Sequence, residues 1–160
     1  MLSLEDSVKA PNHCEINPPR RILVADDDED IRRIHAHILI DAGYEVDSVT
    51  DGAAAWAALQ QNHYDLLLTD NNMPKMSGLE LIENLQAARI RMPVIMATGA
   101  ALPTGPNQNL QIEAVLLKPY AADELLARVW TVMHAMENDA NLAASFHSAG
   151  PGSPPDGLRP

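Results

Sequence analysis

The sequence predicts a single α/β domain built on a doubly wound sheet of parallel strands. Apolar runs alternate along the chain with segments whose apolar residues recur at helical spacing. The run at 21–25 is apolar on both faces, as a strand buried in a parallel sheet must be. Polar residues follow at the ends of four runs, where open α/β sheets bind their ligands. The 160 residues are enough for one domain.

Five segments fit the strands of this sheet. Because these strands alternate with helices and run parallel, their connections should be right-handed crossovers. The predicted strands are 21–25, 44–49, 65–69, 93–98 and 113–117.

Four segments fit helices. The first begins near Glu29 and Asp30, whose charges suit a helix N-terminus, and it stops at Gly43. Its predicted buried stripe is Ile31, Ile34, Ile38 and Leu39. The second is capped by Thr50 or Asp51 and carries Trp56 and Leu59. The third covers about 78–88, and the last covers about 121–138.

One segment breaks the alternation between strands and helices. Residues 99–111 contain two prolines and two glycines where a fourth helix is expected, and prolines at 103 and 106 exclude a regular helix there. We therefore expect the fourth helix to be degenerate or replaced by a mobile loop. As a hypothesis, the conformation of this loop responds when a ligand binds beside Thr98.

The two ends of the chain differ in composition from the middle. Residues 1–19 contain three prolines and no periodic apolar pattern, so we expect a flexible N-terminal extension, a domain over 20–138 and a flexible tail over 139–160. The one cysteine, Cys14, excludes an internal disulfide and suits a reducing compartment.

Charge and hydropathy exclude several classes of function. A formal net charge of −11 repels polyanions, so we expect no nucleic-acid partner. No apolar run approaches the roughly 18 residues that span a bilayer, and the first 20 residues lack the pattern of a signal peptide. We expect a cytoplasmic protein with no membrane partner.

The polar residues at the strand ends form a candidate site. Because they share one edge of the sheet, three carboxylates, a hydroxyl and an ammonium should converge there: Asp26, Asp27, Asp70, Thr98 and Lys118. Two carboxylates about 4 Å apart repel by about 4 kcal/mol at an effective dielectric constant near 20, which argues for a bound cation. Oxygen ligands alone favour Mg²⁺. The metal ion, the ammonium and the hydroxyl together suit a phosphoryl group.

Over residues 20–138 the chain resembles the response-regulator receiver domain of two-component signalling. The resemblance is carried by ILVADDDEDIRRI, LLLTDNNMPKMSGLELI, PVIMATGA and VLLKPY, which are similar to the signature segments of that family and stand in the same order. It implies a flavodoxin-like, five-stranded sheet of order 2-1-3-4-5.

The resemblance also implies roles for the site residues. Asp70 would accept a phosphoryl group from a histidine of a partner kinase or histidine phosphotransfer protein. Asp27, Asp70 and the backbone carbonyl of Asn72 would bind Mg²⁺, with Asp26 acting through water or hydrogen bonds. Thr98 and Lys118 would contact the phosphoryl group, and the bond to Pro119 would be cis. Such a protein catalyses only its own phosphorylation and dephosphorylation, and it signals to a downstream protein that the sequence does not identify.

Two departures from the family pattern bear on the signal. The position that carries a Tyr or Phe in many receivers, three before the lysine, is Val115, so the usual aromatic switch cannot operate. The fourth helix, part of the usual signalling surface, is the segment that the prolines disrupt.

Two alternatives remain open on the sequence alone. One is a pseudo-receiver that binds partners without using phosphate, which the two departures favour and the retained site residues disfavour. The other is a phosphatase similar to the haloacid dehalogenases, in which Asp26 would be the nucleophile. In that case Asp70 has no role.

Overall fold

The structure, a computed structural model, describes residues 19–102 and 110–147, and within them five strands form one parallel sheet. The order is β2-β1-β3-β4-β5, which confirms the predicted topology. The strands are β1 (Arg21–Ala25), β2 (Glu45–Val49), β3 (Leu66–Thr69), β4 (Val94–Thr98) and β5 (Ala114–Leu117).

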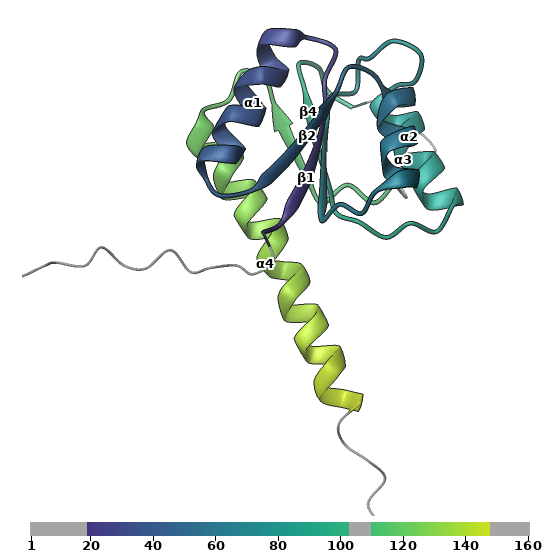
Figure 1. The fold of residues 1–160 in the computed structure, drawn as a ribbon, viewed down its shortest axis with the longest axis vertical. Coiled ribbons are helices and arrows are strands. Elements are labelled where there is room, and N and C mark those ends of the chain that lie inside the picture. The colour runs from purple at the N-terminus through teal and green to yellow at the C-terminus, as the bar shows by residue number, and fades with distance from the viewer. Residues whose placement is uncertain (1–18, 103–109, 148–160) are drawn as a thin grey trace, which may run out of the picture.

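Helices cover the two faces of the sheet. Figure 1 shows α1 (Glu29–Asp41) and α4 (Ala122–His147) on one face, with α2 (Gly52–Gln61) and α3 (Gly78–Ala87) on the other. Side chains of β1 alternate between the two resulting cores: Ile22 and Val24 pack on the α1 and α4 side, and Leu23 and Ala25 pack on the α2 and α3 side. Each fully buried aliphatic side chain of this kind contributes about 1.5–3 kcal/mol to stability.

Local capping contacts set the starts of three helices. The Asp28 side chain accepts hydrogen bonds at the start of α1, and Asp51, one of the two predicted caps, does so for α2. At the start of α3, Ser77 and Glu80 form a reciprocal capping box. Because such caps satisfy backbone N–H groups that have no partner inside the helix, each contributes about 1 kcal/mol.

One predicted core position on α1 is wrong. Ile34 was expected in the buried stripe, but its side chain is 57% exposed, and His35 is buried instead. The buried face of the helix follows His35 and Leu39, which are four residues apart. Helical spacing alone allowed either face, and the apolar character of isoleucine favoured the wrong one.

The connection between β4 and β5 has no helix in residues 99–102 and 110–113. The prolines that predicted the loop fall in 103–109, outside the described residues. Strand alternation turns Val115 and Leu117 toward the α2 and α3 side, where both side chains are exposed, whereas Leu116 is buried against α4. Among residues 19–102 and 110–147, none covers this face of β5 as α2 and α3 cover β3 and β4.

The last helix is longer than predicted. Its end was expected at Asn138, yet α4 continues to His147 and extends beyond the sheet. The physical reason is that residues 139–147 contain good helix formers and no glycine or proline, the first of which is Gly150. The predicted flexible ends otherwise fall in 1–18 and 148–160, outside the described residues.

The start of β1 is tied to the middle of α4. The Arg20 guanidinium forms an ion pair with Glu137 and lies 3.7 Å from a carboxylate oxygen of Asp65.

Among the helices of the described ranges, none has the length and apolarity needed to cross a membrane.

Candidate phosphoryl and metal site

The carboxyl edge of the sheet brings three aspartates together. Asp26 follows β1 and Asp70 follows β3, and both are buried, whereas Asp27 is exposed. One carboxylate oxygen from each of the three lies within 4.8 Å of the others. Neighbouring strands that end in register explain this convergence, since Ala25 is paired with Thr69 and each precedes one of the buried aspartates.

Backbone hydrogen bonds hold the two buried carboxylates in place. Oδ1 of Asp70 accepts from the N–H groups of Asn71, at 2.7 Å, and Asn72, at 3.4 Å. Oδ1 of Asp26 accepts from the N–H of Asp28 at 3.0 Å. In each carboxylate the other oxygen, Oδ2, is the atom that contacts Lys118.

Lys118 supplies the positive charge of the cluster. Its ammonium lies 3.0 Å from Oδ2 of Asp26 and 3.4 Å from Oδ2 of Asp70. Burial by itself lowers the pKa of Lys118, but the hydrogen bond and charge of Asp26, together with the charge of Asp70, outweigh burial and raise it. The ammonium therefore stays protonated at neutral pH.

Thr98 and Lys118 are linked through the backbone at the ends of β4 and β5. The N–H of Lys118 donates to the carbonyl of Thr98 at 2.8 Å, and the Lys118–Pro119 bond is cis. The Thr98 side chain is buried, and its hydroxyl oxygen accepts from the N–H of Ala100 at 3.4 Å. The hydroxyl hydrogen remains available as a donor.

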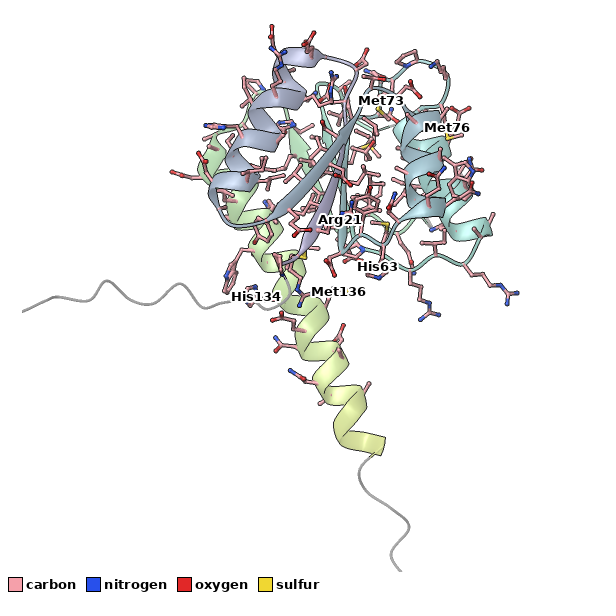
Figure 2. All side chains as sticks on the ribbon, in the orientation of Figure 1. Arg21, His63, Met73, Met76, His134 and Met136 are labelled. Atoms are coloured by element: carbon pink, nitrogen blue, oxygen red, sulfur yellow. The ribbon has the colours of Figure 1, made fainter. Side chains whose placement is uncertain are left out.

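The loop after β3 shapes the edge of the site. Figure 2 shows Met73 and Met76 on this loop beside α2 and α3, and both pack against the core on that side. At the start of α3, a Cβ placed on Gly78 would lie 2.3 Å from the carbonyl oxygen of Asp70. The helix can therefore approach the Asp70 backbone only because residue 78 has no side chain.

The family model for the response regulator receiver domain matches residues 22–130. The chain belongs to the response-regulator receiver family. The response regulator receiver protein CpdR of Brucella abortus is 37% identical over 112 residues, which cover 69% of this chain and 93% of CpdR. Several other curated relatives are longer proteins, and the chain spans about half of their length.

Solved receiver structures share the fold. A CheY-like receiver domain protein from Methanospirillum hungatei JF-1 aligns with a TM-score of 0.70 at 30% identity, covering 76% of this chain and 98% of the other. TrrA from Thermotoga maritima, solved in complex with Mg²⁺ and BeF, aligns with a TM-score of 0.65 at 28% identity. The alignment covers 71% of this chain and 98% of TrrA.

This receiver contains two contacts near the site that the sequence reasoning missed. Lys75, whose φ is 67°, places its ammonium 3.1 Å from Asp51, and the cap hydrogen bond from Ala54 and this lysine lower the pKa of Asp51. His35 stacks on Tyr120, two residues after Lys118. The signal for His35 was present: it stands four residues from both Ile31 and Leu39, on the buried side of α1.

Proposed function

We propose that this receiver accepts a phosphoryl group on Asp70 in a Mg²⁺-dependent reaction and signals through contacts with another protein. The observation that carries the proposal is the approach of Asp26, Asp27, Asp70 and Lys118 from three separate strand ends to one cluster. Receiver domains in general bind Mg²⁺ and take their phosphoryl group from a histidine kinase or a histidine phosphotransfer protein.

The proposed chemistry follows from the charges of the cluster. A carboxylate oxygen of Asp70 forms the new bond to phosphorus while the bond from phosphorus to the donor histidine nitrogen breaks, and that nitrogen keeps the electron pair. Lys118 and the Thr98 hydroxyl stabilise the negative charge on the phosphoryl oxygens. The Asn71 and Asn72 N–H groups hold the carboxylate in position for attack.

The donor set fits Mg²⁺. Hard oxygen ligands, which this cation prefers, come from Asp26, Asp27 and Asp70, and we propose that the backbone carbonyl of Asn72 adds another. When bound, Mg²⁺ supplies positive charge to the phosphoryl oxygens. A catalytic role beyond the protein's own phosphorylation and dephosphorylation is not needed to explain any residue of the cluster.

The test is incubation of the full chain with acetyl phosphate and Mg²⁺, followed by mass spectrometry of the intact protein. We expect a stoichiometric gain of one HPO₃ group, its loss in Asp70→Asn, and its retention in Asp30→Asn, an exposed acid of the first turn of α1. No adduct in the unchanged protein would reject the proposal in favour of the phosphate-independent binding module. Phosphatase turnover that survives Asp70→Asn and is lost in Asp26→Asn would instead favour the haloacid-dehalogenase alternative.

We further propose where the phosphodonor protein docks. A hollow of about 310 Å³ lies beside Lys118 and is lined mainly by apolar atoms of α1 and of the segment that follows β5: Ile31, Ile34, His35, Lys118, Pro119 and Tyr120. The exposed Ile34 side chain gives a partner helix an apolar anchor next to the reacting groups.

Two isoleucines on α1 provide a matched test of this docking site. Ile34 and Ile40 are similarly exposed, but only Ile34 lines the hollow. We expect Ile34→Glu to slow phosphotransfer from phosphorylated histidine kinases at least tenfold and to leave phosphorylation by acetyl phosphate unchanged. Ile40→Glu should alter neither rate. Equal effects of the two substitutions on phosphotransfer would place docking elsewhere.

A further inference from the structure

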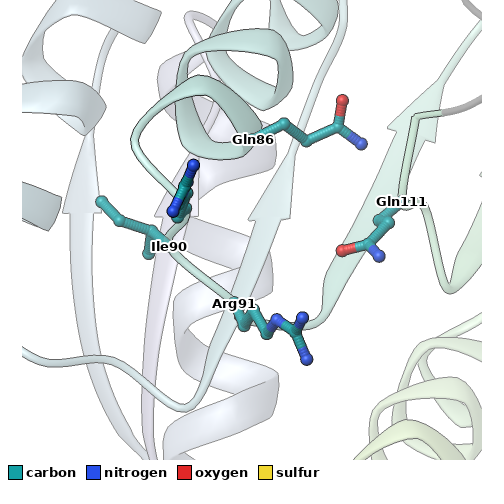
Figure 3. A pocket seen from close by; sticks show the side chains of 5 residues that line it. Gln86, Ile90, Arg91 and Gln111 are labelled. Atoms are coloured by element: carbon teal, nitrogen blue, oxygen red, sulfur yellow. The ribbon is translucent and has the colours of Figure 1, made fainter.

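A second hollow lies at the opposite end of the sheet from the aspartate cluster. It has a volume of about 580 Å³, and its walls come from the end of α3, the loop to β4 and the residues that lead into β5: Gln86, Arg89, Ile90, Arg91 and Gln111. Figure 3 shows the side chains of Gln86, Arg91 and Gln111 around the same space, with Ile90 turned away from it. Hollows of about 300–1,000 Å³ suit small-molecule ligands.

The lining of this hollow is cationic in an acidic protein. The chain has a net charge of −11, yet the described residues around the hollow present two guanidinium groups, two amides and no carboxylate. Within residues 19–102 and 110–147, neither Arg89 nor Arg91 takes part in an ion pair, whereas Arg20, Arg21 and Arg33 each pair with an acid. Arg89 and Arg91 thus carry positive charge that none of the described carboxylates neutralises.

The backbone of Arg89 is a second, independent observation. After α3 the chain turns at Arg89 with φ 57°, and the N–H groups of Arg89 and Ile90 donate to the carbonyls of Gln86 and Leu85. The chain makes the same turn after α1 with the same pattern of hydrogen bonds, but there the residue is Gly43, with φ 95°. Glycine adopts this left-handed conformation without strain, and arginine does not. A strained residue at the wall of a hollow points to a role for its side chain.

We propose that this hollow, the Arg89–Arg91 hollow, binds a small polar molecule that carries phosphate or carboxylate groups. Guanidinium groups bind both kinds of oxyanion through paired hydrogen bonds. The amides of Gln86 and Gln111 can donate to or accept from the remaining polar atoms of such a ligand. The site is separate from Asp70 and does not depend on phosphorylation there.

The test is a titration of the full chain followed by nuclear magnetic resonance, in buffer passed over a chelating resin so that no Mg²⁺ reaches the aspartate cluster. The probes are inorganic phosphate and citrate, each compared with sodium chloride at equal ionic strength. We expect at least one probe to give saturable shifts in the signals of Gln86, Arg89, Arg91 and Gln111. Saturation with phosphate alone assigns the site to a phosphorylated ligand, and saturation with citrate alone assigns it to a carboxylate. No saturable shift with either probe would overturn the proposal.

Substitutions then separate binding from folding. Arg91→Gln should weaken Kd at least tenfold, whereas Arg128→Gln, at an exposed arginine of α4 outside the hollow, should leave Kd unchanged. Arg89→Gly should also weaken Kd at least tenfold while raising the thermal midpoint, because glycine relieves the strained turn. An unchanged Kd in both Arg89→Gly and Arg91→Gln would refute the assignment of the anion to these guanidiniums.

Discussion

The Tyr120 hydroxyl oxygen lies 2.5 Å from Nε2 of His35, and the two rings stack with centroids 5.6 Å apart. This contact joins α1 to the segment that carries Lys118, across 85 positions of sequence. His35 is one of few buried polar side chains in the domain. Its protonation state therefore bears on the stability of the wall between the phosphoryl site and the proposed docking hollow.

The His35–Tyr120 contact predicts a specific pH dependence of stability. Burial, with a smaller contribution from the Lys118 charge, lowers the pKa of His35 below 6.5, although Asp26 and Asp70 partly oppose this. The unfolded chain then binds more protons than the folded one at pH values just below 6.5, so stability falls as the pH decreases through that range.

The measurement is urea unfolding between pH 7.5 and 5.5, roughly one unit on either side of the ordinary histidine pKa. His35→Gln should show a smaller loss of unfolding free energy on acidification than the unchanged protein. His37→Gln, at an exposed position of the same helix, should follow the unchanged protein. Parallel curves for all three proteins would contradict the assignment.

The lysine at the aspartate cluster predicts a change in metal affinity. Lys118→Met removes a positive charge that lies 3.0 Å from Asp26 and competes with a cation for the same carboxylates. We expect Mg²⁺ to bind several-fold more tightly, up to about tenfold, which corresponds to about 1.4 kcal/mol. Isothermal titration calorimetry measures the affinity. Lys75→Met, which removes an exposed lysine that pairs with Asp51, is the control, and equal gains in both variants would show a nonspecific effect of net charge.

The close approach of α3 to the Asp70 backbone predicts that Gly78→Ala is damaging. The added Cβ would lie 2.3 Å from a backbone oxygen, which cannot move away without shifting Asp70. We expect a loss of about 1–3 kcal/mol in thermal or urea unfolding and slower phosphorylation by acetyl phosphate. At Gly99 no described residue places an atom within 4 Å of the corresponding position, so Gly99→Ala should leave stability almost unchanged. A Gly78→Ala protein as stable and as reactive as the unchanged one would show that the helix start can move freely.

Replacing each of two neighbouring leucines of β5 by alanine should have very different effects on the free energy of unfolding. Leu116 is fully buried against α4, so Leu116→Ala should cost about 2–5 kcal/mol of unfolding free energy. Leu117 points to the other face and is 60% exposed, so Leu117→Ala should cost less than about 1 kcal/mol. Urea unfolding of both variants measures the difference. A large cost at Leu117 would mean that the outer face of β5 is covered in solution.

The sequence by itself determined the strands, the cap region of one helix and the polar residues at the sheet edge. These features depend on local patterns: continuous apolar runs, acids directly after them, and glycine or proline at turns. Their placement at one edge followed from the parallel order of the sheet, because every strand of such a sheet ends on the same side. For this reason Asp26, Asp70 and Lys118 could be grouped before any distance was known.

Tertiary structure decided what local patterns leave open. Helical spacing could not choose between Ile34 and His35 for the core, and the choice came from packing of α1 against Tyr120. The exposure of Leu117 and the meeting of Arg89 and Gln111 around one hollow depend on segments that are distant in sequence. Such contacts arise only when the chain packs, because their free energy belongs to pairs of segments and not to either segment alone.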